Sequence, residues 1–242
     1  MAGHSKWANI KHRKAKGDAV KGNIFTKIGR EIAVAVKEGG ADPSSNSKLR
    51  DIIAKARANN MPNDNINRSI KKASGELGSV NYEEIIYEGY GQGGIAFMVE
   101  ALTENKNRTA GDVRHLFDKY GGSLGQTNCV SYMFDRKGVI IVDKEGLLED
   151  DLFLMAIDAG ADDIVTGDEI YEVYTAPTDF TKVRESLENS GIKIIESNIE
   201  YIPQNTVAPD EETESKILKF IEMLEDLDDV QNVYHNGELK NE

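Results

Sequence analysis

The chain contains 242 residues, of which 39% are hydrophobic and 29% charged, a composition typical of a folded protein rather than a disordered one. Its longest apolar runs, such as residues 95–99, are too short to cross a bilayer. Its single cysteine, Cys129, excludes an internal disulfide or a zinc framework. Because no apolar segment behind Met1 resembles a secretory signal, these features predict a cytoplasmic protein.

The formal net charge of −13 is the sum of two opposite regions. Residues 1–72 hold 16 Lys and Arg against 6 Asp and Glu, a net charge of +10, whereas the remaining residues hold 13 basic and 36 acidic groups, a net charge of −23. This asymmetry predicts a basic binding end carried by an acidic body. Solvated faces of differing composition are the alternative, but the helical spacing of the cations argues against it.

The basic end divides into an arm and three helices. Residues 1–22 are polar and hold six Lys and Arg with little apolar periodicity, so we expect a basic arm that is flexible when unbound. Three amphipathic helices with basic outer faces should follow. Their apolar stripes are Phe25, Ile28, Ile32, Ala35 and Val36, ending at Gly39 and Gly40; Leu49, Ile52, Ile53 and Ala56; and, after Met61 and Pro62, Ile66, Ile70 and Ala73.

From Tyr82 the pattern changes to short strands and helices. We expect strands at residues 84–87, 95–102 and 130–134, with a helix in between whose capping box would be Thr109 and Asp112. An acidic helix after Pro209 has a single apolar stripe, so it must dock elsewhere, and it would complete this domain. Between the two lies a block with strands at 139–142, 169–174 and 192–201 and helices at 150–159 and 178–189.

These elements predict a multidomain α+β fold. An N-terminal small helical bundle should be followed by two α+β domains of the ferredoxin-like type, the middle one discontinuous. The expected boundaries are residues 1–80 for the basic arm and helical domain, 81–135 with 204–242 for the discontinuous domain, and 136–203 for an inserted acidic domain.

The sequence contains no evident catalytic or metal-binding motif. The glycine-rich turn at residues 89–94 precedes a strand, so it does not match a dinucleotide fingerprint. The four histidines lack metal-ligand spacing, and His235, near the end of the chain, is expected to be solvated. Acidic pairs such as Asp228 and Asp229 are explained by capping and solubility. We therefore predict a non-enzymatic protein with no cofactor, no metal, no small-molecule substrate and no membrane partner.

The N-terminal cations predict a nucleic-acid interface, because Lys and Arg that neutralise phosphates release counterions and supply sequence-independent affinity. Trp7, the only tryptophan, lies in a segment too polar to bury it, which suits stacking on bases. Packing of Trp7 onto the helical domain is an equal alternative. The predicted nucleic-acid-binding residues are His4, Lys6, Trp7, Lys11, His12, Arg13, Lys14, Lys16, Lys27, Arg30, Lys55, Arg57, Arg68, Lys71 and Lys72.

Several motifs resemble the YebC/PmpR family over essentially the whole chain. They are MAGHSKWANIKHRK at 1–14, IFTKIGREI at 24–32, NMPNDNI at 60–66 and YEGYG at 87–91, with additional matches at 107–109 and 113–115. The resemblance implies an N-terminal helical domain and two α+β domains, one interrupted by the other. It also implies a regulator. The family is usually described as DNA-binding transcriptional regulators, its mitochondrial relatives are translational activators, and bacterial members have been linked to translation on the ribosome.

Three functions stay open at this point. The first is a DNA-binding transcriptional regulator, although no helix is clearly of the kind that reads a major groove. The second is a ribosome-associated translation factor, or translational activator, that binds ribosomal RNA through the arm. The third is a protein-interaction module whose partners bind the acidic domains.

Overall fold

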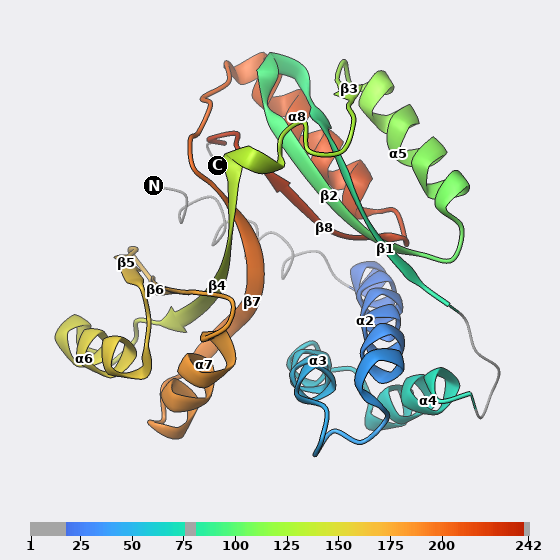
Figure 1. Ribbon diagram of the computed structural model, residues 1–242. Coiled ribbons are helices and arrows are strands. Elements are labelled where there is room, and N and C mark those ends of the chain that lie inside the picture. Colours follow the sequence, from blue (N-terminus) through green and yellow to red (C-terminus); the bar gives the residue numbers. More distant parts are fainter. Residues whose placement is uncertain (1–17, 76–80, 240–242) are drawn as a thin grey trace. The chain divides into compact units, whose positions relative to one another are not determined.

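The structure is a computed structural model that describes residues 18–75 and 81–239 (Figure 1). These residues form two compact units. The first unit consists of the described residues up to Ser131 together with Pro209–His235, and it holds the N-terminal helices and a first sheet. The second unit holds a second sheet within residues 132–208 and the segment from Asn236. The two units are described separately below.

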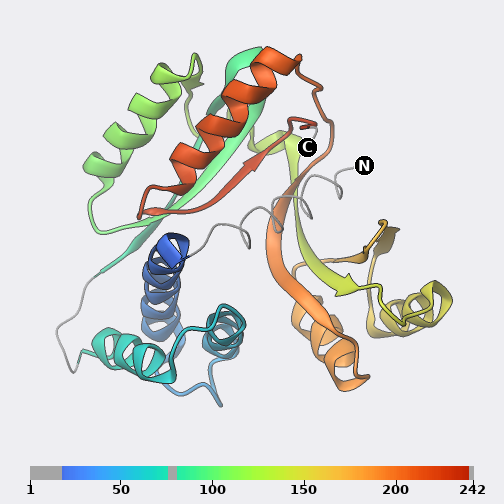
Figure 2. The same cartoon turned by 180° about the vertical axis from the view of Figure 1, so that it is seen from behind.

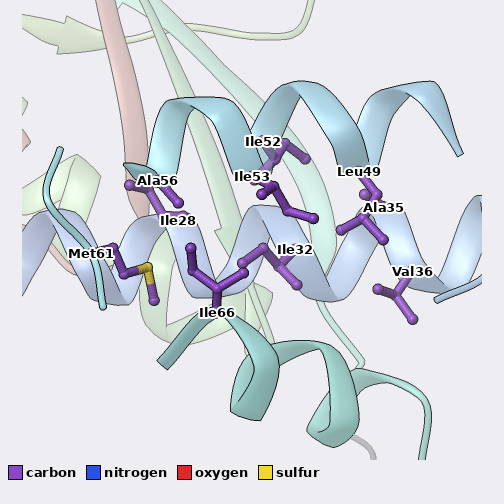
Figure 3. Close-up of a cluster of buried hydrophobic side chains, with 10 residues drawn as sticks. All are labelled: Ile28, Ile32, Ala35, Val36, Leu49, Ile52, Ile53, Ala56, Met61 and Ile66. Carbon is purple, nitrogen blue, oxygen red and sulfur yellow. The ribbon is translucent and has the colours of Figure 1, made fainter. Parts of the chain in front are cut away.

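Three helices form the N-terminal bundle: α2 (Asp18–Gly39), α3 (Ser47–Ala58) and α4 (Asn63–Ala73). The helices α3 and α4 each pack against α2, and the predicted apolar stripes meet between them (Figure 3). The buried core consists of Ile28, Ile32, Ala35, Val36, Leu49, Ile52, Ile53, Ala56, Met61 and Ile66. The helix α2 begins at Asp18, so the expectation that residues 18–22 belong to a flexible arm is wrong.

A buried asparagine fixes the turn between α2 and α3. The Asn46 side chain donates to the carbonyl oxygens of Ala35 and Gly40, each at 2.8 Å, and accepts from the backbone N–H of Leu49 at 3.0 Å. It therefore caps the start of α3 and satisfies carbonyls at the end of α2. Gly40, at φ +86°, supplies the left-handed residue that ends α2.

The first sheet has the strand order β3 (Ser123–Leu124), β1 (Glu83–Tyr90), β2 (Ala96–Thr103) and β8 (Val230–His235), all antiparallel. Helices α5 (Lys106–Lys119) and α8 (Glu211–Glu225) cover one face (Figure 2). There Phe97 of β2, Phe117 of α5 and Phe220 of α8 pack edge to face, with ring centroids 4.9–6.2 Å apart. The short helix η1 (Gln92–Gly94) connects β1 to β2.

The second sheet has the order β5 (Asp163–Thr166), β6 (Ile170–Thr175), β4 (Phe134–Asp143) and β7 (Ile194–Pro203), again antiparallel. Helices α6 (Glu149–Ala159) and α7 (Phe180–Asn189) pack against one face through a shared apolar core. The chain order is therefore βαββαβ, the ferredoxin-like arrangement. A short helix, η2 (Ser131–Met133), precedes β4.

The predicted fold class is confirmed: N-terminal helices precede two four-stranded antiparallel sheets with helices. Every strand of the second sheet lies in sequence between β3 and β8 of the first. The exact domain boundaries at residues 80, 135 and 203 stay a prediction.

Several local expectations are wrong. Asn105 caps α5 by accepting from the Arg108 N–H, and Thr109 lies buried inside that helix, so Thr109 and Asp112 form no capping box. A strand was expected at residues 130–134, where η2 leads into β4. Strands β3, β5 and β8 were not predicted. His235 lies in β8, with its ring centroid 5.8 Å from that of Phe97, rather than in solvent.

Candidate nucleic-acid interface

Eight of the predicted binding residues lie outside the described residues: His4, Lys6, Trp7, Lys11, His12, Arg13, Lys14 and Lys16. The other seven belong to the helical bundle: Lys27, Arg30, Lys55, Arg57, Arg68, Lys71 and Lys72. The structure separates these seven into two groups, one exposed to solvent and one bound to groups of the protein itself.

Three exposed cations share one face of α4. Arg68, Lys71 and Lys72 stand at i, i+3 and i+4, a spacing that places side chains together on a helix. The opposite face holds the buried Ile66 and the half-buried Ile70, so packing against α2 directs the three cations to solvent. Within the described residues none of the three has an ion-pair partner. Their charges are therefore available to an anion.

The end of α3 contributes a fourth exposed cation. Arg57 lies in its last turn, as Lys71 and Lys72 lie in the last turn of α4. The partial negative charge at a helix C-terminus stabilises cations there. Lys55 differs, because its ammonium binds both carboxylate oxygens of Glu31 at 2.8 and 3.1 Å. A phosphate contact by Lys55 would have to compete with that ion pair.

Lys27 and Arg30 of α2 bind the first-sheet part of the same compact unit. The Lys27 ammonium donates to the carbonyl oxygen of Glu225 at 2.7 Å, at the end of α8. The Arg30 guanidinium donates to the carbonyl oxygen of Leu102 at 3.0 Å and to the carboxylate of Asp229. Their role as nucleic-acid contacts stays a prediction, and these intramolecular bonds compete with it.

Asp229 is the centre of a buried polar cluster. Its Oδ2 accepts from Thr109 Oγ1 at 2.6 Å, from Arg108 Nη2 at 2.9 Å and from Thr103 Oγ1 at 3.3 Å, and its Oδ1 accepts from Arg30. Burial raises the pKa of this carboxyl, but the hydrogen bonds from Thr109, Arg108 and Arg30 outweigh burial and hold the pKa below its ordinary value. The carboxylate therefore stays ionised at neutral pH.

This cluster was missed by the sequence analysis, which explained Asp229 by capping and solubility. Asp229 is 6% exposed and precedes β8, while its partners come from α2, the end of β2 and α5. If a strand had been predicted at residues 230–235, Asp229 would have been recognised as the residue directly before a strand of the sheet. No local pattern points to its partners, because they lie more than 100 positions away.

A second buried carboxylate anchors the loop before β4. Glu88 of β1 accepts hydrogen bonds from the backbone N–H groups of Asn128, Val130 and Ser131 at 2.7, 2.9 and 2.8 Å. Burial raises the pKa of Glu88, but these hydrogen bonds leave it below its ordinary value. The carboxylate fixes a loop whose residues Gln126, Thr127 and Asn128 are exposed.

The described residues offer little support for catalysis. No group of three or more His, Cys, Asp and Glu within them could hold a metal ion. Burial and the nearby Glu88 carboxylate raise the pKa of the Cys129 thiol, which disfavours the reactive thiolate. No described helix is long and apolar enough to cross a membrane. The predicted absence of enzymatic activity stays a prediction.

Comparison with known proteins gives matches over nearly the whole chain. Residues 5–76 match the model described as "TACO1/YebC protein N-terminal domain", and residues 82–237 match "TACO1/YebC second and third domain". A protein of Acetivibrio thermocellus is 62% identical over 98% of both chains, and one of Clostridium botulinum is 58% identical over 98% of this chain and 97% of its own. Both are named "Probable transcriptional regulatory protein".

A solved structure is similar as well. The crystal structure of a conserved hypothetical protein, Aq1575, from Aquifex aeolicus is 47% identical in sequence, with a TM-score of 0.85 over 94% of each chain. Its fold therefore corresponds to the helices and two sheets described above.

Proposed function

This chain belongs to the TACO1/YebC family, and from that premise we propose that it is a DNA-binding regulator of transcription whose helical bundle contacts the phosphates. The observation that carries the proposal is the exposed cationic face of α4, formed by Arg68, Lys71 and Lys72. The names of its relatives support a role in regulating transcription.

The physical basis is counterion release. Each cation that neutralises a phosphate displaces a condensed counterion and so contributes affinity that falls as salt rises. The three cations of α4 have no competing ion pair among the described residues, so they contact a nucleic acid without first breaking an intramolecular bond. Arg57 at the end of α3 adds a fourth group of the same kind.

The arm extends this surface in our proposal. Trp7 would stack on a base. Phosphates would be contacted by the basic residues of the arm: His4, Lys6, Lys11, His12, Arg13, Lys14 and Lys16. The remaining residues after 72, with their net charge of −23, repel phosphate. Binding is therefore directed to the N-terminal end of the chain.

Base reading has a candidate on the same helix. Asn65 is exposed and stands three residues before Arg68, so the two side chains share a face of α4. Asn pairs with adenine and Arg with guanine in the major groove. This pairing favours DNA as the partner and gives α4 the role of the reading helix.

Ribosomal RNA is the second candidate partner, in a translation factor bound to the ribosome. The observation that favours it is the position of Arg57, Lys71 and Lys72 in the last turns of their helices, where they suit phosphates of any nucleic acid. This candidate predicts that the protein sediments with ribosomes in a sucrose gradient. The association should weaken as salt rises, and it should be lost when four arm residues are replaced by alanine: Lys6, Trp7, Arg13 and Lys14.

Selection from a random duplex DNA library tests the reading role of α4. The wild-type protein is expected to enrich a defined sequence, and Arg68→Ala to relax it at one position, with a loss of about 1–3 kcal/mol. Lys71→Ala is expected to weaken binding to all DNA sequences to the same extent. Enrichment of no sequence by the wild-type protein, together with tighter binding to ribosomal RNA, would contradict the proposed DNA role.

A further inference from the structure

Four of the eight large hydrophobic residues that are exposed in the described chain lie within residues 148–157, at the start and along the outer face of α6. Leu148 is 69% exposed, Leu154 65%, Phe153 50% and Ile157 41%. The other four, Tyr90, Tyr132, Val165 and Leu218, are scattered over other elements. Isolated exposed apolar residues are ordinary, but a contiguous group marks an interaction surface.

The spacing makes the group on α6 contiguous. Phe153 and Ile157 stand at i and i+4, and Leu154 lies three residues before Ile157, so the three side chains form one patch. The helix already packs through another face, where Leu152, Ala156 and Ala159 are buried in the core of the second sheet. The helix therefore has two apolar faces, and only one of them has a partner within the described residues.

Acidic side chains surround this patch. Asp150 and Asp158 lie four residues before and after Leu154 on the same side of the helix, and both are exposed. Helix α6 holds four carboxylates, Glu149, Asp150, Asp151 and Asp158, and not one Lys or Arg. Residues 136–203 as a whole hold 16 acidic and 6 basic groups, a net charge of −10.

We propose that the face of α6 formed by Phe153, Leu154 and Ile157 is a docking site for a basic amphipathic helix of a partner protein. The apolar side chains of that helix would cover the patch, and its Lys or Arg residues would pair with Asp150 and Asp158. Nucleic acid does not fit this surface, because phosphate is repelled by the carboxylates and has no apolar group for the patch. A second copy of this chain docked through the same face of α6 would oppose carboxylate to carboxylate.

The site differs from the proposed nucleic-acid interface in residues and in the sign of its charge. The cations of the bundle bind anions, whereas α6 binds cations that carry an apolar face. One molecule can therefore engage a nucleic acid and a basic protein through separate surfaces.

The test uses the full chain and a synthetic helical peptide with a leucine face flanked by lysines, followed by fluorescence anisotropy. Phe153→Ser with Leu154→Ser is expected to weaken peptide binding by at least about ten-fold, because two exposed apolar contacts are lost. The matched control is Leu218→Ser, since Leu218 is also an exposed leucine on an acidic helix, α8. This control is expected to bind as the wild type does.

Three outcomes would overturn the proposal. The first is peptide binding by the α6 variant as tight as that of the wild type, which would mean that net charge alone attracts the peptide, because the serine substitutions leave the charge unchanged. The second is a result in which a peptide with glutamates in place of the lysines binds as tightly as the lysine peptide does. The third is self-association of the wild-type chain in sedimentation equilibrium that the α6 variant abolishes, because the occupant would then be a second copy. Unchanged circular dichroism and thermal unfolding of the variant exclude a folding defect.

The peptide assay is also independent of the proposed DNA role. Replacing Arg68, Lys71 and Lys72 by alanine should leave peptide binding unchanged, because those residues lie on α4 in the other compact unit. Loss of DNA binding with retained peptide binding therefore separates the two functions.

Discussion

Arg30 of α2 donates a hydrogen bond to the carboxylate of Asp229, a residue 199 positions later in the chain that precedes β8. The same carboxylate binds Arg108 and Thr109 of α5. The contact joins the N-terminal bundle to the first sheet within one compact unit. Because Arg30 is held there, its charge stabilises the fold, while the exposed cations of α4 stay available to a ligand.

Removal of the Asp229 carboxylate should strongly destabilise the protein. Asp229→Ala removes the acceptor that two arginines and two threonine hydroxyls share, and loss of one partner of a buried ion pair lowers the free energy of unfolding by about 3–5 kcal/mol. Urea denaturation measures the loss. The neighbouring exposed residue gives the control, since Asp228→Ala should change the free energy of unfolding by less than about 0.5 kcal/mol. Equal effects of the two variants would refute the role assigned to Asp229.

The ionisation of Asp229 should appear in the pH dependence of stability. Its pKa in the folded protein lies below the ordinary value of 3.8, so its stabilising effect is fully present above pH 3.8 and is lost as the pH falls through the folded pKa. The difference in free energy of unfolding between the wild type and Asp229→Asn should therefore be constant near neutral pH and shrink below pH 3.8. A difference that grows on acidification would show that the pKa of Asp229 is raised, contrary to this account.

Glu88 should control the order of the loop that precedes β4. Glu88→Gln replaces a carboxylate that accepts three backbone N–H bonds with an amide that has one acceptor oxygen, so an amide donor would face an N–H. We expect a loss of about 1–3 kcal/mol in stability. Hydrogen exchange at the amides of Asn128, Val130 and Ser131 should accelerate. The control is Glu84→Gln, an exposed carboxylate on the same strand, which should leave exchange at these three amides unchanged.

A glycine inside α5 offers a stabilising substitution. A Cβ added at Gly111 has open space around it, and the residue is exposed on the helix. Gly111→Ala should therefore stabilise the protein by about 0.5–1 kcal/mol, because alanine loses less backbone entropy on folding. Gly138 of β4 gives the contrasting case, since a Cβ there would lie 2.7 Å from the Phe180 ring, and Gly138→Ala should destabilise. Thermal unfolding compares the two, and stabilisation by both would be inconsistent with the packing described around Gly138.

Local patterns were sufficient for the helical bundle. The residues Ile28, Ile32, Leu49, Ile53 and Ile66 recur at helical spacing, and each lies in the buried core. Such a stripe depends only on neighbours within one turn or two, so the sequence displays it directly. The order of helix and strand in the second sheet was mostly predictable for the same reason.

Long-range contacts were not predictable in this way. Strand β8 is six residues long with polar residues at several positions, and it was recognised only through its pairing with β2, more than 100 residues earlier. Without that strand, Asp229 was taken for a solvated residue and Arg30 for a free cation. Counting cations along the sequence predicts a basic end, but only the structure separates Arg68, Lys71 and Lys72, which are exposed, from Lys27, Arg30 and Lys55, which bind groups of the protein itself.

The salt dependence of nucleic-acid affinity shows whether the cationic face of α4 binds a nucleic acid. A fluorescent duplex is titrated with the full-length wild type, with the triple variant Arg68→Ala, Lys71→Ala and Lys72→Ala, and with a control of the same composition, Arg114→Ala, Lys182→Ala and Lys219→Ala, whose residues are also exposed. If Lys71 and Lys72 each contact a phosphate while Arg68 contacts a base, the slope of log affinity against log salt falls by about 2 in the α4 variant and stays at the wild-type value in the control. A wild-type slope in the α4 variant would contradict the assignment of this face as the nucleic-acid interface.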